Sequence, residues 1–461
     1  MSALALLLAE ALRNAHHSVE SLGADAGKSA AALVAIAEGV ARALALRQVQ
    51  PAELVHVQIG NRPSDLGALL GVWQAGAVAV PIHVAAAPAT VDALKQRTRA
   101  RFSVDEDRVE TIGTAAPLER PLLNDAALVI FTSGSTGLPK GAVIGHQRLA
   151  GKIAALDRLL KFRADDAVLV PLQLTFIFGL WVSLLALRSG SRLILVPKFS
   201  NQAIHDGLQR GATILAGVPS MYRTLLAEPG FAMPAVRQML TGGEVLPIKL
   251  AGSMRNAAPA AGLYDLYGLT ETGSCDFVLD PANQPDGFGA IGVPTEGVAY
   301  RIAKGSGELE INTPFAMLGY LDDPQLTADS FRDGYFRTGD LACLTPGGRV
   351  QLIGRAKDII SRGGIKIAPL EIDNLLAEHP KIMAALCAGV PDERLGEVIH
   401  AVVVPRAGEA VAADDLRHWL LQRVERYKVP DVFYFADALP AGPTGKADRR
   451  GVAQLTLRAR R

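Results

Sequence analysis

The stretch ALVIFTSGSTGLPKG, residues 127–141, joins an apolar run typical of a buried strand to a loop dense in glycine and hydroxyl side chains. Glycine lets backbone N–H groups close around an anion, and the serine and threonine hydroxyls add further donors. Lys140 supplies a positive charge. The loop is therefore predicted to hold a polyphosphate. It is not a P-loop, because Pro139 and Gly141 flank the lysine, and a plain surface turn is the alternative.

Apolar runs on both sides of this loop predict alternating strands and helices over most of the chain. Strand–helix–strand units of this kind form parallel-rich sheets covered by helices. The expected strands are 54–61, 77–84, 127–132, 167–171, 192–197 and 212–219. The expected helices are 28–47, 64–76, 146–160, 180–190 and 220–228.

The pattern changes after this region. Short apolar segments such as GELEINTP (307–314) alternate with glycine turns, which predicts a β-rich module. A junction at 352–364 leads to a small unit of two helices and two strands with a basic tail. The predicted fold class is α/β. A large N-terminal domain, residues 1–354, has parallel-rich sheets covered by helices plus the β-rich module, and a small α+β C-terminal domain, residues 355–461, follows it.

The composition is that of a globular cytoplasmic protein. The 461 residues are 49% hydrophobic and 20% charged, which rules out wholesale disorder. Lys and Arg number 47 against 46 Asp and Glu, so the balance argues against nucleic acid or an anionic membrane surface as the main partner. Three cysteines favour a reducing cytoplasm over a disulfide scaffold.

Two apolar segments could be mistaken for membrane signals. The first, residues 1–14, has no basic residue before its apolar stretch and contains Glu10, so an amphipathic helix is expected rather than a signal peptide. The second, Ala167–Leu187, is uncharged and long enough to span a bilayer. Pro171 and Gly179 weaken its helical propensity, so a buried strand, turn and helix are expected and no membrane span.

Six short motifs resemble those of the adenylate-forming enzymes, which include acyl-CoA and aryl-CoA ligases, peptide-synthetase adenylation domains and luciferases. The first motif is TSGSTGLPKG, at 132–141. The others follow in the family's order and cover almost the whole chain: YGLTE (267–271), TGDL (338–341), GRAKD (354–358), IAPLEI (367–372) and TGK (444–446). The part before the first motif is shorter than is usual in the family.

The resemblance implies a reaction in two steps. A carboxylate attacks the α-phosphorus of ATP and pyrophosphate leaves; a thiol then attacks the acyl-adenylate and AMP leaves. The implied ligands are ATP, Mg²⁺, a small carboxylic acid, and either CoA or the phosphopantetheine of a separate acyl carrier protein. The implied ATP-binding residues are Thr132, Ser133, Gly134, Ser135, Thr136, Gly137, Lys140, Gly243, Glu244, Asp265, Tyr267, Gly268, Thr270, Asp340 and Arg355.

Several of these implied roles suit the side chain concerned. Glu271 is the expected Mg²⁺ ligand, because Mg²⁺ is usually held by one or two carboxylates plus substrate phosphates. Thr270 is expected beside the α-phosphate and Tyr267 beside the adenine. Asp340 suits the ribose diol, because a carboxylate accepts two donors. Lys446 is expected to bridge the substrate carboxylate and the α-phosphate. Taken alone, Asp340 could be an ordinary turn residue and Lys446 a solvated side chain.

The resemblance also implies that the C-terminal domain is mobile and rotates between the two steps. Lys357 lies where the family has its hinge. One orientation would bring Lys446 to the reacting groups. The other would bring Gly363 and Gly364, whose backbone leaves room for a thin pantetheine arm. A plain turn is the alternative for this pair of glycines.

The acid pocket is expected beside the phosphate loop, in the segment LTFIFGL (174–180). Many fatty-acyl members have a histidine where this chain has Phe176, and the departure resembles benzoate and hydroxybenzoate ligases. A flat acid stacks well on phenylalanine walls, whereas Phe176 cannot pair with the ammonium group of an amino acid. The expected pocket residues are Phe176, Phe178, Gly179, Gly217, Gly242 and Gly268. Simple core positions are the alternative for both phenylalanines.

These observations favour an ATP-dependent ligase that joins an aryl acid, such as a benzoate or hydroxybenzoate, to a thiol. A medium-chain or other fatty acid is the alternative substrate. A catalytically inactive adenylate-binding scaffold is the alternative class, and the joint presence of Lys140, Glu271, Asp340 and Lys446 argues against it. A hydrolytic ATPase is disfavoured by the residues that flank Lys140.

Overall fold

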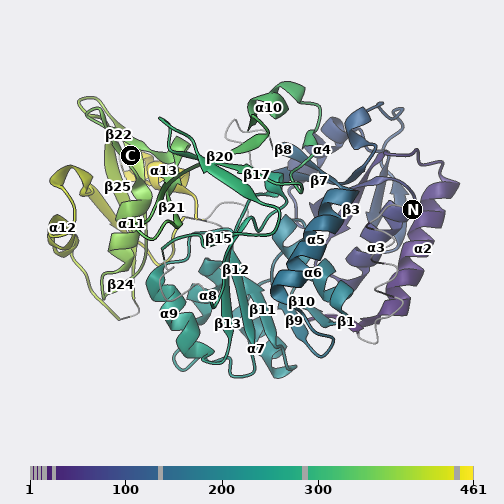
Figure 1. The fold of residues 1–461 in the computed structure, drawn as a ribbon, viewed down its shortest axis with the longest axis horizontal. Helices are drawn as coiled ribbons and strands as arrows, with labels where there is room; N and C mark the ends of the chain where they lie inside the picture. The colour runs from purple at the N-terminus through teal and green to yellow at the C-terminus, as the bar shows by residue number, and fades with distance from the viewer. Residues whose placement is uncertain are drawn as a thin grey trace.

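The computed structural model describes residues 18–22, 27–132, 139–282, 289–406, 408–440 and 447–459, together with Leu4, Leu8 and Leu12. Two large sheets with helices between them form most of the chain before residue 300, and a β-rich module connects them to a separate C-terminal unit (Figure 1). Leu4, Leu8 and Leu12 are helical and buried, at the spacing of one face of an amphipathic helix.

The first sheet has seven strands, in the order β18 (Gly319–Tyr320), β8 (Lys140–Gly145), β7 (Ala126–Thr132), β4 (Val78–His83), β3 (Leu54–Ile59), β5 (Phe102–Asp105) and β6 (Arg108–Thr111). Its central strands β7, β4, β3 and β5 are parallel, whereas β8 is antiparallel to β7. Thr132 pairs with Lys140 in this register, so the two ends of the Gly/Ser-rich segment lie side by side.

The second sheet has nine strands, in the order β15 (Val293–Pro294), β14 (Phe277–Leu279), β13 (Gly262–Tyr267), β12 (Gln238–Gly242), β11 (Ile214–Gly217), β9 (Ala167–Val170), β10 (Arg192–Leu195), β1 (Ser18–Ser21) and β2 (Lys28–Ser29). The six strands from β13 to β1 are parallel. Because parallel strands end at a common edge, the residues after β9, β11, β12 and β13 are brought together there.

Four helices pack in the main core with strands of both sheets: α2 (Ala30–Leu46), α3 (Pro63–Gln74), α5 (His146–Leu160) and α6 (Ile177–Ser189). Nearly every side chain of α6 from Ile177 to Leu187 is buried, which explains why this segment is apolar on all sides. The second sheet also packs against α7 (Asn201–Gln209), α8 (Pro219–Leu225) and α9 (Ile248–Ala257), and α4 (Pro88–Thr98) packs in a core beside the first sheet.

The β-rich module is a five-stranded sheet of β16 (Ala299–Ile302), β17 (Glu308–Asn312), β20 (Tyr335–Leu344), β19 (Phe331–Arg332) and β21 (Val350–Arg355), with α10 (Pro324–Asp329) nearby. The C-terminal unit has its own sheet of β22 (Ile360–Arg362), β23 (Ile365–Ile367), β24 (Ile382–Asp392), β25 (Gly396–Pro405) and β26 (Val432–Phe435). Its helices are α11 (Pro369–Ala377), α12 (Ala413–Leu421) and α13 (Arg449–Ala459).

The expected α/β class with a large and a small domain is confirmed. The expected strands and helices all occur, with ends shifted by a few residues. Several strands of the two large sheets were missing from the expectation, among them β5, β12 and β13. Another is β8, which lies between the Gly/Ser-rich segment and α5 and gains its strand conformation by pairing with β7. No helix in the described part of the chain is long and apolar enough to cross a membrane.

Candidate active site

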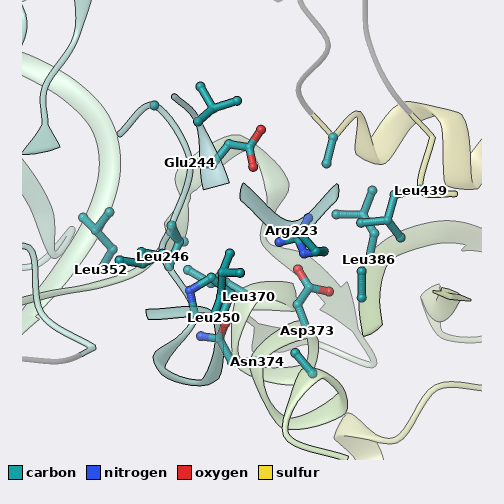
Figure 2. Close-up of a pocket in the computed structure, with 18 of the residues that line it drawn as sticks. Arg223, Glu244, Leu246, Leu250, Leu352, Leu370, Asp373, Asn374, Leu386 and Leu439 are labelled. Atoms are coloured by element: carbon teal, nitrogen blue, oxygen red, sulfur yellow. The ribbon is translucent and has the colours of Figure 1, made fainter. Parts of the chain in front are cut away.

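A cleft of about 2140 Å³ lies between the N-terminal domain and the C-terminal unit. Figure 2 shows side chains from both parts around it, with Arg223 and Glu244 from the N-terminal domain and Leu370, Asp373 and Leu439 from the C-terminal unit. Most of the sequence-predicted site residues line this one cleft: Thr132, Phe176, Phe178, Gly179, Gly243, Glu244, Asp265, Tyr267, Gly268, Thr270, Glu271, Asp340, Arg355 and Lys357.

Asp340, in β20, is a buried carboxylate with both oxygens engaged. The Tyr267 hydroxyl donates to Oδ2 at 2.6 Å, and Arg355 Nε lies 2.9 Å from Oδ1. Arg355 is the register partner of Asp340 across β20 and β21. Burial and the Asp340 charge raise the pKa of Tyr267 well above its ordinary value, so the phenol remains a donor. The carboxylate is held in one orientation and keeps lone pairs for the two hydroxyls of a ribose.

Glu271 lies in η2 (Thr270–Thr272), a single 3₁₀ turn soon after β13. The Tyr320 hydroxyl donates to Glu271 Oε1 at 3.0 Å, and the ammonium of Lys140 lies 5.5 Å from the centroid of the same ring. Burial and the Glu271 charge raise the pKa of Tyr320. The described residues contain no group of three or more side chains that could hold a metal. A carboxylate with one oxygen fixed suits Mg²⁺ that takes its other ligands from phosphates and water.

The chain turns back sharply beneath η2. Gly273, Ser274 and Cys275 have φ angles of +84°, +66° and +50°, so two of the three are non-glycine residues in the left-handed region. Such a conformation costs about 1–3 kcal/mol for each residue and persists only where neighbouring contacts impose it. Gly268 has no space for a Cβ, which would collide with the backbone nitrogen of Cys275.

Two glycines, Gly242 at the end of β12 and Gly243 directly after it, set the course of the chain at the cleft. A Cβ at Gly242 would collide with the carbonyl oxygen of Leu266 in β13, so glycine permits the close approach of these two strands. Gly243 has a φ of +81° and leads the chain along the cleft. Glu244 accepts a hydrogen bond of 2.9 Å from the Ser220 hydroxyl.

Two further charged groups on this side have shifted pKa values. Burial raises the pKa of Asp265 to about 7, and the backbone N–H of Leu266 opposes the shift. Asp265 lies two residues before Tyr267 in β13, and both line the cleft. Burial lowers the pKa of Arg223, and the charge of Glu244 opposes that shift.

Phe176 lies at the start of α6 and is 39% exposed on the cleft wall. Phe178 stacks on Trp181 with ring centroids 5.3 Å apart, and Trp181 Nε1 donates to the Ser274 hydroxyl at 3.3 Å. A Cβ at Gly179 would lie 2.5 Å from the Gln173 carbonyl oxygen, so the turn into α6 requires glycine. Of the other expected pocket glycines, Gly268 lines the cleft. Gly217 and Gly242 end β11 and β12, and their neighbours Val218 and Gly243 line the cleft instead.

The segment that carries Phe176 is fastened by Asn61, a fully buried residue just after β3. Its Nδ2 donates to the carbonyl oxygens of Leu172 at 2.9 Å and Val196 at 3.0 Å, and its Oδ1 accepts from the backbone N–H of Leu174 at 2.9 Å. Asn61 has a φ of +57°, which asparagine tolerates better than most residues. One side chain therefore joins the ends of strands from both sheets.

Of the site residues expected in the C-terminal unit, some line the cleft and others do not. Lys357, in η3 (Ala356–Asp358), lines the cleft, and so does Ala447, directly after Lys446. Gly363 and Gly364 form the turn between β22 and β23, with φ angles of +55° and +83°, and are not among the residues that line the cleft. Lys446 and the phosphate-loop residues Ser133, Gly134, Ser135, Thr136 and Gly137 lie outside the described residues.

Three residues that hold this site were not found by sequence reasoning. Tyr320 and Lys152 have no motif around them, and Asn61 was noted only as the end of a strand. An asparagine directly after a buried strand is the one available signal, because polar side chains at such ends often serve the adjacent cleft. The contacts of Tyr320 and Lys152 join segments far apart in the sequence.

Comparisons with known proteins agree with this geometry. The sequence model of the AMP-binding enzyme family matches residues 13–321, and that of the AMP-binding enzyme C-terminal domain matches residues 371–446. The chain is 32% identical to a feruloyl-CoA synthase of an Amycolatopsis species, over 88% of this chain and 89% of the relative. It is 33% identical to an indoleacetate–CoA ligase of Aromatoleum aromaticum, over 82% and 78%. It resembles the crystal structure of ATP-bound MatB from Rhodopseudomonas palustris, with a TM-score of 0.85 and 27% identity over 99% of both chains.

Proposed function

The chain belongs to the AMP-binding enzyme family of AMP-forming acid–thiol ligases, and on that basis we propose that it activates an aryl carboxylic acid and transfers the acyl group to CoA. The observation that carries the proposal is Phe176, whose ring is exposed on the cleft wall at the start of α6. A flat acid can stack on such a ring, and the stacking contributes about 0.5–1.5 kcal/mol beyond the free energy gained by burying its apolar surface. The names of two relatives, for ferulate and indoleacetate, support an aromatic acid.

In the proposed first step the described residues position ATP. Asp340, fixed by Tyr267 and Arg355, accepts hydrogen bonds from the ribose hydroxyls. Glu271 holds Mg²⁺, which neutralises charge on the phosphates when bound. The acid's carboxylate oxygen bonds to the α-phosphorus while the bond to the β-phosphate oxygen breaks and pyrophosphate leaves. Lys446 offsets the negative charge between the carboxylate and the α-phosphate.

In the proposed second step the C-terminal domain, residues 355–461, rotates about Lys357. The loop with Gly363 and Gly364 then lies against the pantetheine arm, and both glycines already have the positive φ that a tight turn requires. The thiolate sulfur bonds to the acyl carbon, the carbon–oxygen bond to AMP breaks, and AMP leaves. CoA is the proposed acceptor, and the phosphopantetheine of a separate carrier protein is the alternative.

The proposal is tested by acid-dependent ATP–pyrophosphate exchange on a panel of benzoate, 4-hydroxybenzoate, ferulate, octanoate and decanoate. Each acid that supports exchange is then incubated with CoA, and the thioester is identified by mass spectrometry. We expect exchange and thioester formation with at least one aryl acid at higher kcat/KM than with either alkyl acid. A preference for octanoate or decanoate over every ring would refute the aryl assignment. Exchange without a CoA thioester would refute CoA as acceptor.

A further inference from the structure

A buried lysine lies beneath the turn that carries Glu271, and neither step of the proposed reaction uses it. Lys152, in α5, is 1% exposed. Its ammonium donates to the carbonyl oxygen of Cys275 at 2.8 Å, lies 3.6 Å from Asp276 Oδ1, and is 5.1 Å from the centroid of the Phe315 ring. Every one of these contacts is made to the segments that support the turn.

Asp276 links this lysine to the turn itself. Its Oδ2 accepts a hydrogen bond from the hydroxyl of Thr272, the last residue of η2, and its backbone N–H donates to the carbonyl oxygen of Tyr267 at 2.7 Å. Burial raises the pKa of the Asp276 carboxyl, and the charge of Lys152 opposes that shift. Oδ1 makes no hydrogen bond in the described part of the chain, so the charge of Lys152 is its compensation.

The strained backbone beneath η2 is held at several points, and the Cys275 carbonyl is the one that Lys152 contacts. The carbonyl oxygen of Cys275 accepts from Lys152 and also from the Thr295 hydroxyl at 2.9 Å. Ser274 and Cys275 both have positive φ angles, and two donors on the Cys275 carbonyl fix the orientation of its peptide group.

The other side of the turn is held from the same face of α5. Arg148, four residues before Lys152, donates to the carbonyl oxygen of Met317 at 2.8 Å. The backbone N–H of Met317 in turn donates to the carbonyl oxygen of Glu271 at 2.7 Å. A buried ion pair contributes little net stability compared with apolar residues of the same shape. The arrangement therefore needs an explanation other than stability.

We propose that Lys152 is a positioning residue for Mg²⁺-bound ATP: it fixes the Cys275 peptide and Asp276, and through them the orientation of Glu271. The inference rests on the proposed role of Glu271 as the Mg²⁺ ligand. Residues that hydrogen-bond a metal ligand directly typically change metal affinity by about 10–100-fold when they are replaced, and Lys152 acts on Glu271 through the Cys275 peptide, Asp276 and Thr272.

The experiment measures ATP affinity by isothermal titration calorimetry, in Mg²⁺ and in EDTA, without any acid. The ratio of the two affinities is the Mg²⁺-dependent gain. In Lys152→Met we expect the gain to fall about tenfold or more, with ATP affinity in EDTA within about twofold of wild type. Because Lys152→Met leaves Asp276 buried without a counter-charge, Lys152→Met/Asp276→Asn is measured alongside it. Thr295→Val retains the ion pair, removes the second donor to Cys275, and should lose part of the gain.

Arg101→Met is the matched control, because Arg101 forms an ion pair at 2.7 Å with the nearly buried Glu53, away from the residues that line the cleft. It should lower the unfolding midpoint and leave the Mg²⁺-dependent gain unchanged. A wild-type gain in the folded double variant would overturn the role of Lys152, and a wild-type gain in Thr295→Val would overturn the part assigned to the Cys275 peptide. A gain that is absent from wild type, or that survives Glu271→Gln, would overturn the Glu271 assignment and this inference with it.

Discussion

Asp265 gives a direct test of the electrostatics of the cleft. Burial raises the pKa of its carboxyl from 3.8 to about 7, a rise of about 3. Because the folded-state pKa is the raised one, the stability contributed by the protonated carboxyl is complete below about pH 4 and is lost as the pH rises through about 7. A change of one in pKa corresponds to about 1.36 kcal/mol, so the raised pKa of Asp265 changes the free energy of unfolding by about 4 kcal/mol in total. By proton linkage, about 2.5 kcal/mol of this free energy of unfolding is lost between pH 5 and pH 8.

Asp265→Asn removes this ionisation, so the stability of the variant relative to wild type should improve by about 2.5 kcal/mol between pH 5 and pH 8. Urea unfolding at both pH values measures it, followed by tryptophan fluorescence, because Trp73 and Trp181 are buried in the same domain. The same substitution at the exposed Asp107 controls for the chemical change. If Asp265→Asn differs from wild type by the same amount at both pH values, burial does not govern this carboxyl and the reasoning fails.

Four substitutions test other parts of the cleft. Tyr267→Phe should raise the KM for ATP about tenfold or more, since a hydrogen bond to the charged Asp340 contributes about 1.5–3 kcal/mol; an unchanged KM in steady-state assays would contradict this. Asn61→Ala should raise the KM of the acid more than that of ATP, and equal rises would indicate general loosening instead. Phe176→Ala should fold normally, because its ring is partly exposed, and should lower kcat/KM on benzoate-like acids relative to bulkier ones; an identical acid profile would count against a pocket wall. Lys446→Ala should abolish adenylate formation but spare thioester formation from pre-made adenylate, and equal loss in both half-reactions would remove its assigned role.

Much of the fold could be predicted because parallel strands buried on both faces give unbroken apolar runs. The strand β8 could not, because its sequence continues the glycine-rich segment and its conformation depends on pairing with β7. The end of α12 at Leu421 also depends on packing, because the residues after it form η4 (Arg426–Lys428), which brings Lys428 to within 2.9 Å of Glu371.

In the candidate site, too, some features could be predicted from the sequence and others could not. Tyr267, Glu271, Asp340 and Arg355 belong to short motifs, so their presence could be read from the chain. Their mutual contacts could not, because the register of β20 and β21 decides that Arg355 meets Asp340. The supporting contacts of Tyr320 and Lys152 depend on how distant segments pack, and a lysine within a helix ordinarily indicates a solvated face.

The burial of α6 on all sides has a consequence for dissecting the protein into fragments. The core cluster that contains it takes side chains from both large sheets, with Val57 in β3 of one and Val168 in β9 of the other. A fragment that keeps only one sheet would leave an apolar helix without a partner, so no cut between the sheets should give an independent piece. The C-terminal unit differs, because Ile360, Ile372 and Leu420 belong to a core of its own. That unit is therefore the part of the chain best suited to domain exchange between relatives. Cooperative unfolding of residues 360–461 expressed alone would show that it folds independently.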